Sequence, residues 1–483
     1  RNTRRNARRH IARGKDDDSK TYILNPSCRA DFYVMRGFFS FIFSKLFLCM
    51  LLITAYVAGF VLLCLWLPTF LSLGAAALGA FILTAAAAIK AALGQYPAEF
   101  RCAWLLAIAA LPVLGAAAFF ITLYRPSPCE DALDFRGATD CVTCRYYEDG
   151  KSFFDGIYAA IDGARESVYL EFYILARGRI FDGLYARLEG ALARGVDVKI
   201  ITDGLGSALR LPKKQLKRLK KLGAEVRIFN RLLPPPLSRL NFRDHRKIAV
   251  IDGKTAFSGG MNIADEYAGL TRPHGQWKDS AFEVTGHTAE YFHALFLSVW
   301  SGCRKLALPP PDKGLVTVQP VSDSPPAHCG RASGLIVREI YAARRRVWAF
   351  TPYLCPDERI FAALCDAAAR GVDVKIIVPA VPDKKTAYAV TCDCAARLSK
   401  RGVGVYAFTP GFMHAKAVIC DGGCFLGSYN LDCRSLWLNY ECGAHFEGGL
   451  TDDVARDFEG CLALSAPFEG KERKLFRLFS PLA

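Results

Sequence analysis

The hydrophobic pattern of the 483-residue chain changes after its first quarter. Residues 46–89 and 102–124 carry no charged side chain, whereas the chain from about residue 135 onward mixes apolar and charged positions. A helix of about 20 residues crosses the hydrocarbon core of a membrane, so the first run is about twice as long as one span requires. Pro68 lies near the middle of that run, where a tight turn between two spans fits.

These runs predict a membrane anchor over residues 46–124, following a basic tail at residues 1–45. We expect three spans, at about 46–67, 70–89 and 102–124. Two spans plus an interfacial or re-entrant segment is the alternative. The runs are too long for the apolar part of a cleaved signal peptide. The many Arg residues of the tail favour a cytoplasmic position for it, but the side on which the remainder lies depends on the number of spans.

From about residue 135 the pattern alternates between helical and strand periodicity. The amphipathic segment "RIFDGLYARLEGALARG" leads into the apolar segment "VDVKIITDG", and the same unit returns as "ERIFAALCDAAARG" and "VDVKIIVPA". The octapeptide "RGVDVKII" occurs identically at residues 194 and 370. A basic helix, a short strand and a His-x-Lys segment follow each copy, so the chain contains an internal duplication.

Strand–helix–strand alternation predicts an α/β fold. We expect two duplicated halves, residues 135–305 and 325–483, each with a mixed, mostly parallel sheet flanked by helices. Pro-rich segments between residues 305 and 330 mark the link between them. The two halves should pack on each other.

One spacing of polar residues occurs at equivalent places in both halves: His-x-Lys, four further residues, an Asp, then a Gly/Ser-rich turn and an Asn. The residues are His245, Lys247, Asp252 and Asn262 in the first half, and His414, Lys416, Asp421 and Asn430 in the second. Period-two alternation places each His and Lys on one face of a strand. The chain has only 8 His, so this repetition argues against a purely structural role for both.

Two halves that meet about a pseudo-twofold axis would bring both sets into one pocket. One imidazole could attack a phosphodiester phosphorus and form a phosphohistidine, while the other protonates the departing oxygen. The Lys and Asn side chains, with the hydroxyls of Ser258 and Ser428, could stabilise the negative charge of the transition state. This chemistry requires no metal or other cofactor, and the sequence shows no convincing cluster of metal ligands.

A nucleophilic His also needs a carboxylate at its second ring nitrogen. Asp279 and Glu441, which lie downstream of the motifs in the two halves, are the candidates. Asp252 and Asp421 belong to the repeated spacing and are grouped with the catalytic residues. Their position beside Gly at a strand end nevertheless favours a turn-forming or ion-pairing role.

The composition indicates an anionic partner but does not identify which one. The 62 Lys and Arg against 46 Asp and Glu give a net charge of +16, which suits either nucleic acid or an acidic lipid surface. Cys141 and Cys144 have a metal or redox spacing. No second pair completes a zinc set, so a structural or disulfide role is favoured.

The paired motifs resemble the HKD motifs of the phospholipase D superfamily. From about residue 95 onward the chain is similar to bacterial cardiolipin synthases, including the stretches "RLNFRDHRKIAVIDGKTAFSGGMNIADEY" and "GSYNLDCRSLWLNYE". The resemblance implies a multi-pass phosphatidyltransferase of the bacterial plasma membrane. Such an enzyme joins two phosphatidylglycerol molecules into cardiolipin and releases glycerol. Nucleic acid would not be a partner, and a homo-oligomer is compatible with the family.

The resemblance also implies a role for each residue. His245 would be the nucleophile and His414 the general acid and then base, although the near symmetry of the halves leaves their order open. Phosphate would be bound by Lys247, Lys416, Asn262 and Asn430, and the imidazoles would be oriented by Asp279 and Glu441.

Three alternatives remain at this point. A membrane-bound phospholipase D of the same superfamily would let water attack the intermediate and release phosphatidic acid. A nuclease on the same fold would suit the basic charge, but the apolar spans count against it. A catalytically inactive lipid-binding protein is the third, and the complete sets of His, Lys and Asn count against that.

Overall fold

The structure is a computed structural model, and it describes residues 56–59, 70–94, 98–122, 139–230, 242–301, 316–325 and 330–473. The strands of the first half are β1 (Thr139–Tyr147), β2 (Ser167–Phe172), β3 (Asp197–Asp203), β4 (Glu225–Phe229), β5 (Lys247–Ile251), β6 (Thr255–Gly259), β7 (Gln276–Lys278) and β8 (Ala281–Gly286). The second half contributes β9 (Val316–Asp323), β10 (Arg346–Phe350), β11 (Asp373–Pro379), β12 (Gly404–Phe408), β13 (Gly411–Met413), β14 (Ala417–Cys420), β15 (Gly423–Gly427), β16 (Glu441–Glu447) and β17 (Ser465–Pro467).

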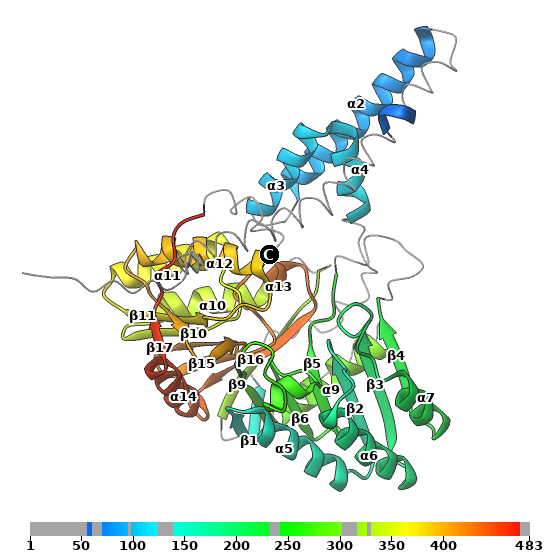
Figure 1. Cartoon of the computed structure of the whole chain (residues 1–483), viewed down its shortest axis with the longest axis vertical. Coiled ribbons are helices and arrows are strands. Elements are labelled where there is room, and N and C mark those ends of the chain that lie inside the picture. The colour runs from blue at the N-terminus through cyan, green and yellow to red at the C-terminus, as the bar shows by residue number, and fades with distance from the viewer. Residues whose placement is uncertain are drawn as a thin grey trace, which may run out of the picture. The chain divides into compact units, whose positions relative to one another are not determined.

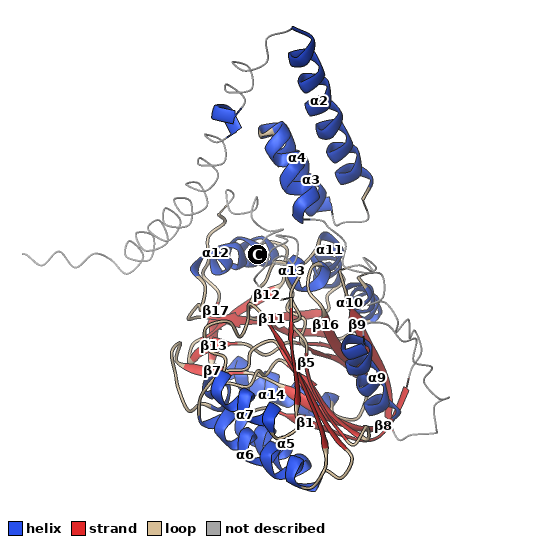
Figure 2. Cartoon of the chain, turned by 90° about the vertical axis from the view of Figure 1, so that its right-hand side faces the viewer, coloured by secondary structure: helices blue, strands red, loops and turns tan. Residues whose placement is uncertain are grey.

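The strands form one large sheet (Figure 1) and one small sheet of β7 and β13, which are labelled in Figure 2. The large sheet has 15 strands in the order β17-β12-β11-β10-β14-β15-β16-β9-β1-β8-β6-β5-β2-β3-β4. Read outward from its centre, the order β1-β8-β6-β5-β2-β3-β4 repeats as β9-β16-β15-β14-β10-β11-β12. The antiparallel pair β1 and β9 joins the two repeats. The duplication seen in the sequence is therefore a duplication of strand order within one continuous sheet.

The sheet is mixed, as expected, but the prediction that it is mostly parallel is wrong. Only β2–β3–β4 and β10–β11–β12 pair in parallel within the two repeats, and the other pairings along the large sheet are antiparallel. The reason is local. β5 and β6 are separated by three residues, and a connection that short can only join antiparallel strands, because a parallel pair needs a long crossover.

Helices cover both faces of the large sheet. The first half has α5 (Gly150–Gly163), α6 (Arg179–Ala193), α7 (Lys213–Lys221), the short η2 (Asp265–Ala268) and α9 (His287–Ser301). The second half has α10 (Arg331–Ala342), α11 (Glu358–Ala369), α12 (Lys385–Ser399), α13 (Cys433–Trp437) and α14 (Thr451–Ala463).

Strand periodicity divides the core between the two faces. On β2, Val168 and Leu170 pack into a cluster with α5, α6 and α7, whereas Tyr169 belongs to a cluster on the opposite face. That opposite cluster also contains Phe292 of α9 and Phe458 of α14, so it draws side chains from both halves. The two halves thus share a hydrophobic core, and neither can shift without disturbing the other.

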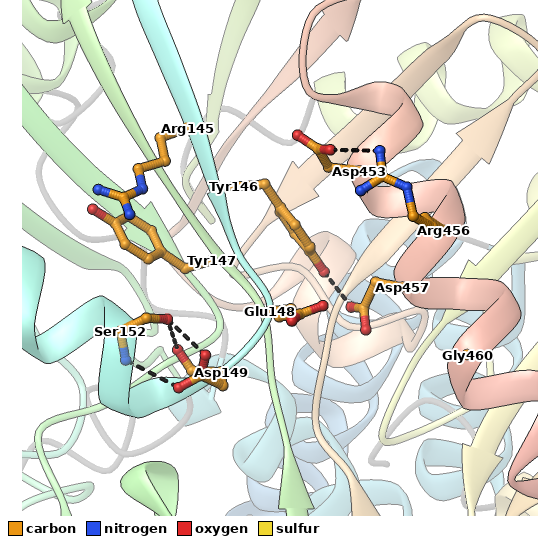
Figure 3. A pocket seen from close by; sticks show the side chains of 10 residues that line it. All are labelled: Arg145, Tyr146, Tyr147, Glu148, Asp149, Ser152, Asp453, Arg456, Asp457 and Gly460. Atoms are coloured by element: carbon orange, nitrogen blue, oxygen red, sulfur yellow. Dashed lines mark hydrogen bonds and ion pairs between the residues drawn. The ribbon is translucent and has the colours of Figure 1, made fainter.

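A cavity of about 410 Å³ lies between β1, α5 and α14 (Figure 3). Figure 3 shows Tyr146 and Asp457 pointing toward each other, and the Tyr146 hydroxyl donates to the Asp457 carboxylate at 2.6 Å. The same carboxylate pairs with the buried Lys278 amino group at 2.7 Å. Lys278 ends β7, so this contact fixes the strand that leads to Asp279.

The anchor region contains α2 (Phe70–Leu93), α3 (Ala98–Ala110) and α4 (Pro112–Thr122). Among the described residues, one helix, Gly74–Leu93, is long and apolar enough to cross a membrane. It corresponds to the span predicted at 70–89. Of the span predicted at 46–67, only residues 56–59 lie within the described residues, and they are helical.

The prediction of a single span at 102–124 is wrong, because this run forms two short helices. A Cβ on Gly115 would lie 2.5 Å from the carbonyl oxygen of Ala107, eight residues earlier. Eight residues of a continuous helix extend about 12 Å, so the chain must fold back between α3 and α4. Pro112 begins the second helix, a position where its missing N–H costs nothing. Residues 98–122 therefore form two short apolar helices, and the alternative of two spans plus an interfacial or re-entrant segment stays a prediction.

Candidate active site

Two backbone hydrogen bonds between the halves, one donated by each motif His, bring the motif segments together. β7 of the first half pairs in parallel with β13 of the second, and the N–H of His414 donates to the carbonyl oxygen of Lys278 at 2.7 Å. In the corresponding contact, the N–H of His245 donates to the carbonyl oxygen of Tyr440 at 2.9 Å. Each acceptor is the residue just before a predicted carboxylate, so each His lies beside the carboxylate of the other half.

The side chains of the two His residues also pair with groups of the other half. His245 Nδ1 lies 2.9 Å from Glu441 Oε1, and His414 Nδ1 lies 2.6 Å from Asp279 Oδ2. Both predicted carboxylates therefore contact an imidazole, and the pairing is crossed between the halves. With Nδ1 engaged, Nε2 of each ring is the nitrogen left for a substrate.

The two lysines complete one shared electrostatic site. Lys247 and Lys416 are buried, and each amino group donates to the backbone carbonyl of the His in its own motif. Lys416 Nζ also lies 2.8 Å from His414 Nδ1. Burial lowers the pKa of each imidazole most, and the lysine of the same motif lowers it further against the opposing charge of the paired carboxylate. The lysine of the other half adds a smaller effect in the same direction. Each lysine thus acts on the imidazole of the other half across the boundary between the halves.

Burial sets the protonation states. It lowers the pKa of His245 to about 4 against the opposing charge of Glu441, and it lowers the pKa of His414 to about 3 against Asp279. Burial alone would raise the pKa of Glu441, but His245 and Lys247 hold it below its ordinary value. At neutral pH the site therefore holds two neutral imidazoles and two ionised carboxylates, which suits a nitrogen nucleophile.

The two asparagines are buried beside the motifs but make different contacts. Asn262 accepts from the N–H of Ile174 at 2.9 Å and donates to the Tyr267 hydroxyl at 2.7 Å. In Asn430 the backbone N–H donates to the Ser435 hydroxyl at 2.9 Å, and Oδ1 has no hydrogen-bond partner within the described part of the chain. The binding of phosphate by both amides stays a prediction.

The two serines do not occupy equivalent positions. Counted back from the motif Asn, Ser428 corresponds to Gly260, not to Ser258. The Ser258 hydroxyl donates to the carbonyl oxygen of Lys247 at 2.8 Å, and the Ser428 hydroxyl donates to Glu441. Each hydroxyl has one hydrogen, so in this arrangement the serines support the catalytic groups and neither offers a donor to phosphate. Phosphate binding by Ser258 and Ser428 stays a prediction.

Asp252 and Asp421 are turn residues at the strand ends, which corrects their grouping with the catalytic residues. Their φ angles are +53° and +47°, in the left-handed region. Asp252 accepts the backbone N–H groups of residues 165, 166 and 167, and Asp421 those of residues 344, 345 and 346. Both lie at the far end of their strands from the His-x-Lys pair. They tie the strand turn to the loop before the neighbouring strand.

We expect Asp252→Ala to lower the free energy of unfolding by about 1–3 kcal/mol, because three N–H groups lose their acceptor and Ala disfavours positive φ. The turnover of the molecules that remain folded should not change. Thermal unfolding in detergent and kcat per folded molecule measure the two quantities. Asp155→Ala, which removes an exposed helical ion pair with Lys151, is the control and should change stability by less than about 0.5 kcal/mol. A lower kcat with unaltered stability would contradict the turn assignment.

A buried network of charges around His245 was not identified from the sequence. Arg243 pairs with Asp203 at 3.2 Å, and Arg246 pairs with Glu171 at 3.3 Å. The ring of Tyr173 lies edge-on to His245, with 5.0 Å between the centroids. The available signal was "RDHRK", in which charged residues flank the motif His on both sides immediately before an apolar strand. Such residues must be paired when buried.

A duplicated mixed sheet that brings two His-x-Lys segments into one buried site defines the phospholipase D-like class of proteins. A family model described as "Cardiolipin synthase, PLD-like domain" matches residues 157–296 and 336–462, more than half of the chain. The chain therefore belongs to the cardiolipin synthase family, and the resemblance found in the sequence is confirmed. Members of this family are phosphatidyltransferase enzymes.

Individual relatives agree. Cardiolipin synthase A of Pseudomonas putida (strain W619) is 37% identical over 308 residues, covering 61% of this chain and 62% of the relative. Cardiolipin synthase of Geobacillus kaustophilus is 34% identical over 324 residues, covering 64% of each. The chain thus spans somewhat less than two thirds of the length of these two relatives. A crystal structure of phosphatidylserine synthase from Haemophilus influenzae shares the fold, with a TM-score of 0.55 at 14% identity, covering 69% of this chain and 90% of that one.

Proposed function

We propose that the protein is a cardiolipin synthase that joins two phosphatidylglycerol molecules into cardiolipin and glycerol through a phosphohistidine. The crossed pairs His245–Glu441 and His414–Asp279 carry this proposal. They supply two oriented imidazoles in one buried site, which a double displacement at phosphorus needs. Family membership supports the phosphatidyl transfer, and the substrates and the intermediate are part of the proposal.

In the first step, Nε2 of His245 attacks the phosphorus of one phosphatidylglycerol. The bond to the headgroup glycerol oxygen breaks, and His414 gives that oxygen a proton, so glycerol leaves. In the second step, His414 takes the proton from a headgroup hydroxyl of a second phosphatidylglycerol, whose oxygen attacks the phosphorus. The phosphorus–nitrogen bond breaks and cardiolipin forms. One phosphodiester replaces another, so no nucleotide is consumed.

The anionic phosphodiester changes the protonation of the site. Burial and the nearby lysines give each of the two imidazoles a low pKa. A bound phosphate anion between the rings offsets those cations and raises the pKa of His414, so that this ring can carry the proton that the leaving oxygen needs. Lys247 and Lys416 stabilise the added oxyanion charge.

The competing function is hydrolysis, in which water in place of a lipid hydroxyl attacks the phosphohistidine. Purified protein in detergent–phosphatidylglycerol micelles separates the two. Synthase activity yields cardiolipin and glycerol in equal amounts, whereas hydrolysis yields phosphatidic acid. Phosphatidic acid without cardiolipin would defeat the proposal.

We further propose that the protein works at the plasma membrane of a bacterium, with phosphatidylglycerol and cardiolipin as its lipid partners. The exposed apolar side chains of α2 support a lipid surrounding, since Phe81 is 70% and Leu93 is 79% exposed. Residues of α2, α3 and α4 also pack in one cluster with Phe242 and Tyr440, which flank the motif of the first half and its carboxylate. Membrane helices in that position would keep the catalytic groups close to the lipid phosphates.

The pH dependence of kcat/KM should follow the lysines on the alkaline side. Burial lowers the pKa of Lys247 to about 7 and of Lys416 to about 8. Only the protonated amines attract the phosphodiester, so kcat/KM should fall as pH rises through 7 to 8. It should fall again below about 4, where His245 takes up a proton and loses its nucleophilic lone pair. A rate profile from pH 3.5 to 9.5 with sedimentation at each pH, to separate loss of lipid binding, checks this. A kcat/KM that still rises above pH 9 would contradict the assignment.

A further inference from the structure

The two imidazoles lie in different surroundings although the halves share one fold. His414 is surrounded by aromatic rings, with centroids 5.3 Å from Tyr267, 5.2 Å from Trp277 and 5.7 Å from Phe412. Trp277 and Phe412 face each other across the β7–β13 pair, 4.8 Å apart. His245 has Tyr173 as its ring neighbour and a network of buried ion pairs around it.

Two polar atoms beside this aromatic cluster are buried without a hydrogen-bond partner in the described part of the chain. They are Nε1 of Trp277, a donor, and Oδ1 of Asp383, an acceptor. The other oxygen of Asp383 accepts from the Tyr353 hydroxyl at 2.5 Å, and the Tyr353 ring lies 6.5 Å from Phe412. Buried donors and acceptors are seldom left unpaired, because each costs the free energy of its lost contact with water. Such atoms at an active site indicate a ligand.

The negative charge of the Asp383 carboxylate acts on groups close to His414. Its charge acts on Lys416 and on Tyr353, as does the charge of Asp432. On the other side, the corresponding acidic group near Tyr173 is Asp203, which is paired with Arg243 at 3.2 Å. Asp383 Oδ2 lies 4.0 Å from the Lys384 amino group, but Asp383 Oδ1 has no hydrogen-bond partner among the described residues. Both oxygens of Asp203, in contrast, accept backbone N–H groups, from Gly206 and Asp244.

We propose that Trp277 Nε1 and Asp383 Oδ1 form the subsite for the headgroup glycerol, next to His414. This inference rests on the proposed function, in which His414 exchanges protons with a glycerol oxygen in both steps. A glycerol carries further hydroxyls beside the reacting one, and each can accept from an indole N–H and donate to a carboxylate. The apolar edges of its carbons suit the rings of Phe412 and Trp277. The indole N–H and the carboxylate both contact the additional hydroxyls, so the subsite selects a polyol headgroup over a simple alcohol.

The reverse reaction tests this subsite directly, because free alcohols can be varied at will. Cardiolipin and glycerol give two phosphatidylglycerol molecules, whereas cardiolipin and 1-propanol give phosphatidylpropanol and phosphatidylglycerol. 1-Propanol has the reacting hydroxyl and lacks the others. Asp383→Ala should raise the KM for glycerol at least about tenfold with little change in kcat, since a hydrogen bond to a charged group is lost. The KM for 1-propanol should change much less, because 1-propanol has no additional hydroxyl to contact Asp383, and any effect through Lys416 is common to both alcohols.

Trp277→Phe keeps the ring and removes the N–H, so it should raise the KM for glycerol about fivefold and leave 1-propanol unaffected. Asp453→Ala, which removes the exposed partner of Arg456 on α14, is the control and should leave both alcohols unchanged. Equal losses with both alcohols would overturn the subsite, because a merely structural role cannot distinguish them.

Two further outcomes are informative. If ethanolamine is a better acceptor than glycerol for the unaltered protein and this preference disappears in Asp383→Asn, the carboxylate binds an ammonium and the glycerol subsite is wrong. If the unaltered protein produces neither cardiolipin from phosphatidylglycerol nor either alcohol product, the proposed function itself fails, and the inference fails with it.

Discussion

Replacing His245 with Ala should lower cardiolipin formation by about 10⁴-fold or more, because the site loses the atom that forms the covalent bond to phosphorus. Replacing His414 should also stop turnover with phosphatidylglycerol, since glycerol is a poor leaving group without a proton. Product formation from radiolabelled phosphatidylglycerol measures both losses. These equal outcomes would not reveal which ring is the nucleophile.

A phosphodiester with a nitrophenol leaving group separates the two roles, because nitrophenolate departs without a proton. His414→Ala should then release one equivalent of nitrophenol and retain a labelled phosphoryl group on His245, which mass spectrometry of the digested protein locates. His245→Ala should release none. A label on His414 in the His245→Ala protein would reverse the assignment of the two rings.

The candidate site residues stand out in the sequence because the pattern is local and repeated. His245 and His414 stand two residues before a Lys and just before an apolar strand, and the spacing to Asn262 and Asn430 is nearly the same. Family membership confirms the class of enzyme that this pattern indicated. The α/β duplication was equally visible, because the octapeptide at 194 and 370 ends one helix and begins one strand in each half.

The errors concern properties that spacing does not encode. The direction of strand pairing depends on which strands become neighbours, and the short turn after Ile251 made the β5–β6 pair antiparallel. Hydrophobicity measured the length of the run at 102–124 but gave no sign that the chain folds back at Leu111. Ser258 and Ser428 were grouped because both are Ser near a Gly, whereas counting back from the motif Asn pairs Ser428 with Gly260.

The crossing of the carboxylates was also beyond the sequence, since Asp279 and Glu441 each follow the motif of their own half by a similar distance. Only the exchanged backbone contacts of Lys278 and Tyr440 decide which His each one reaches. Because the pairing is crossed, the two carboxylate variants should have different effects on the two imidazoles.

Glu441→Gln and Asp279→Asn should each lower cardiolipin formation by about 10²–10⁴-fold, because an amide cannot stabilise the imidazolium or fix the tautomer. The two variants should differ in the nitrophenyl assay. Glu441→Gln should behave as His245→Ala does and release little nitrophenol, since it disables the nucleophile of the other half. Asp279→Asn should behave as His414→Ala does and accumulate the labelled His245.

Pairing within each half would exchange these two outcomes, so Asp279→Asn without nitrophenol release, together with a trapped label in Glu441→Gln, would refute the crossed arrangement. Glu447→Gln is the matched control, because Glu447 ends the same strand, β16, with an exposed side chain. It should retain full activity. Ser428 and Ser435 both donate to the Glu441 carboxylate. A Gln there would have to turn its amide group away from one of them, so the loss in Glu441→Gln should exceed the loss in Asp279→Asn.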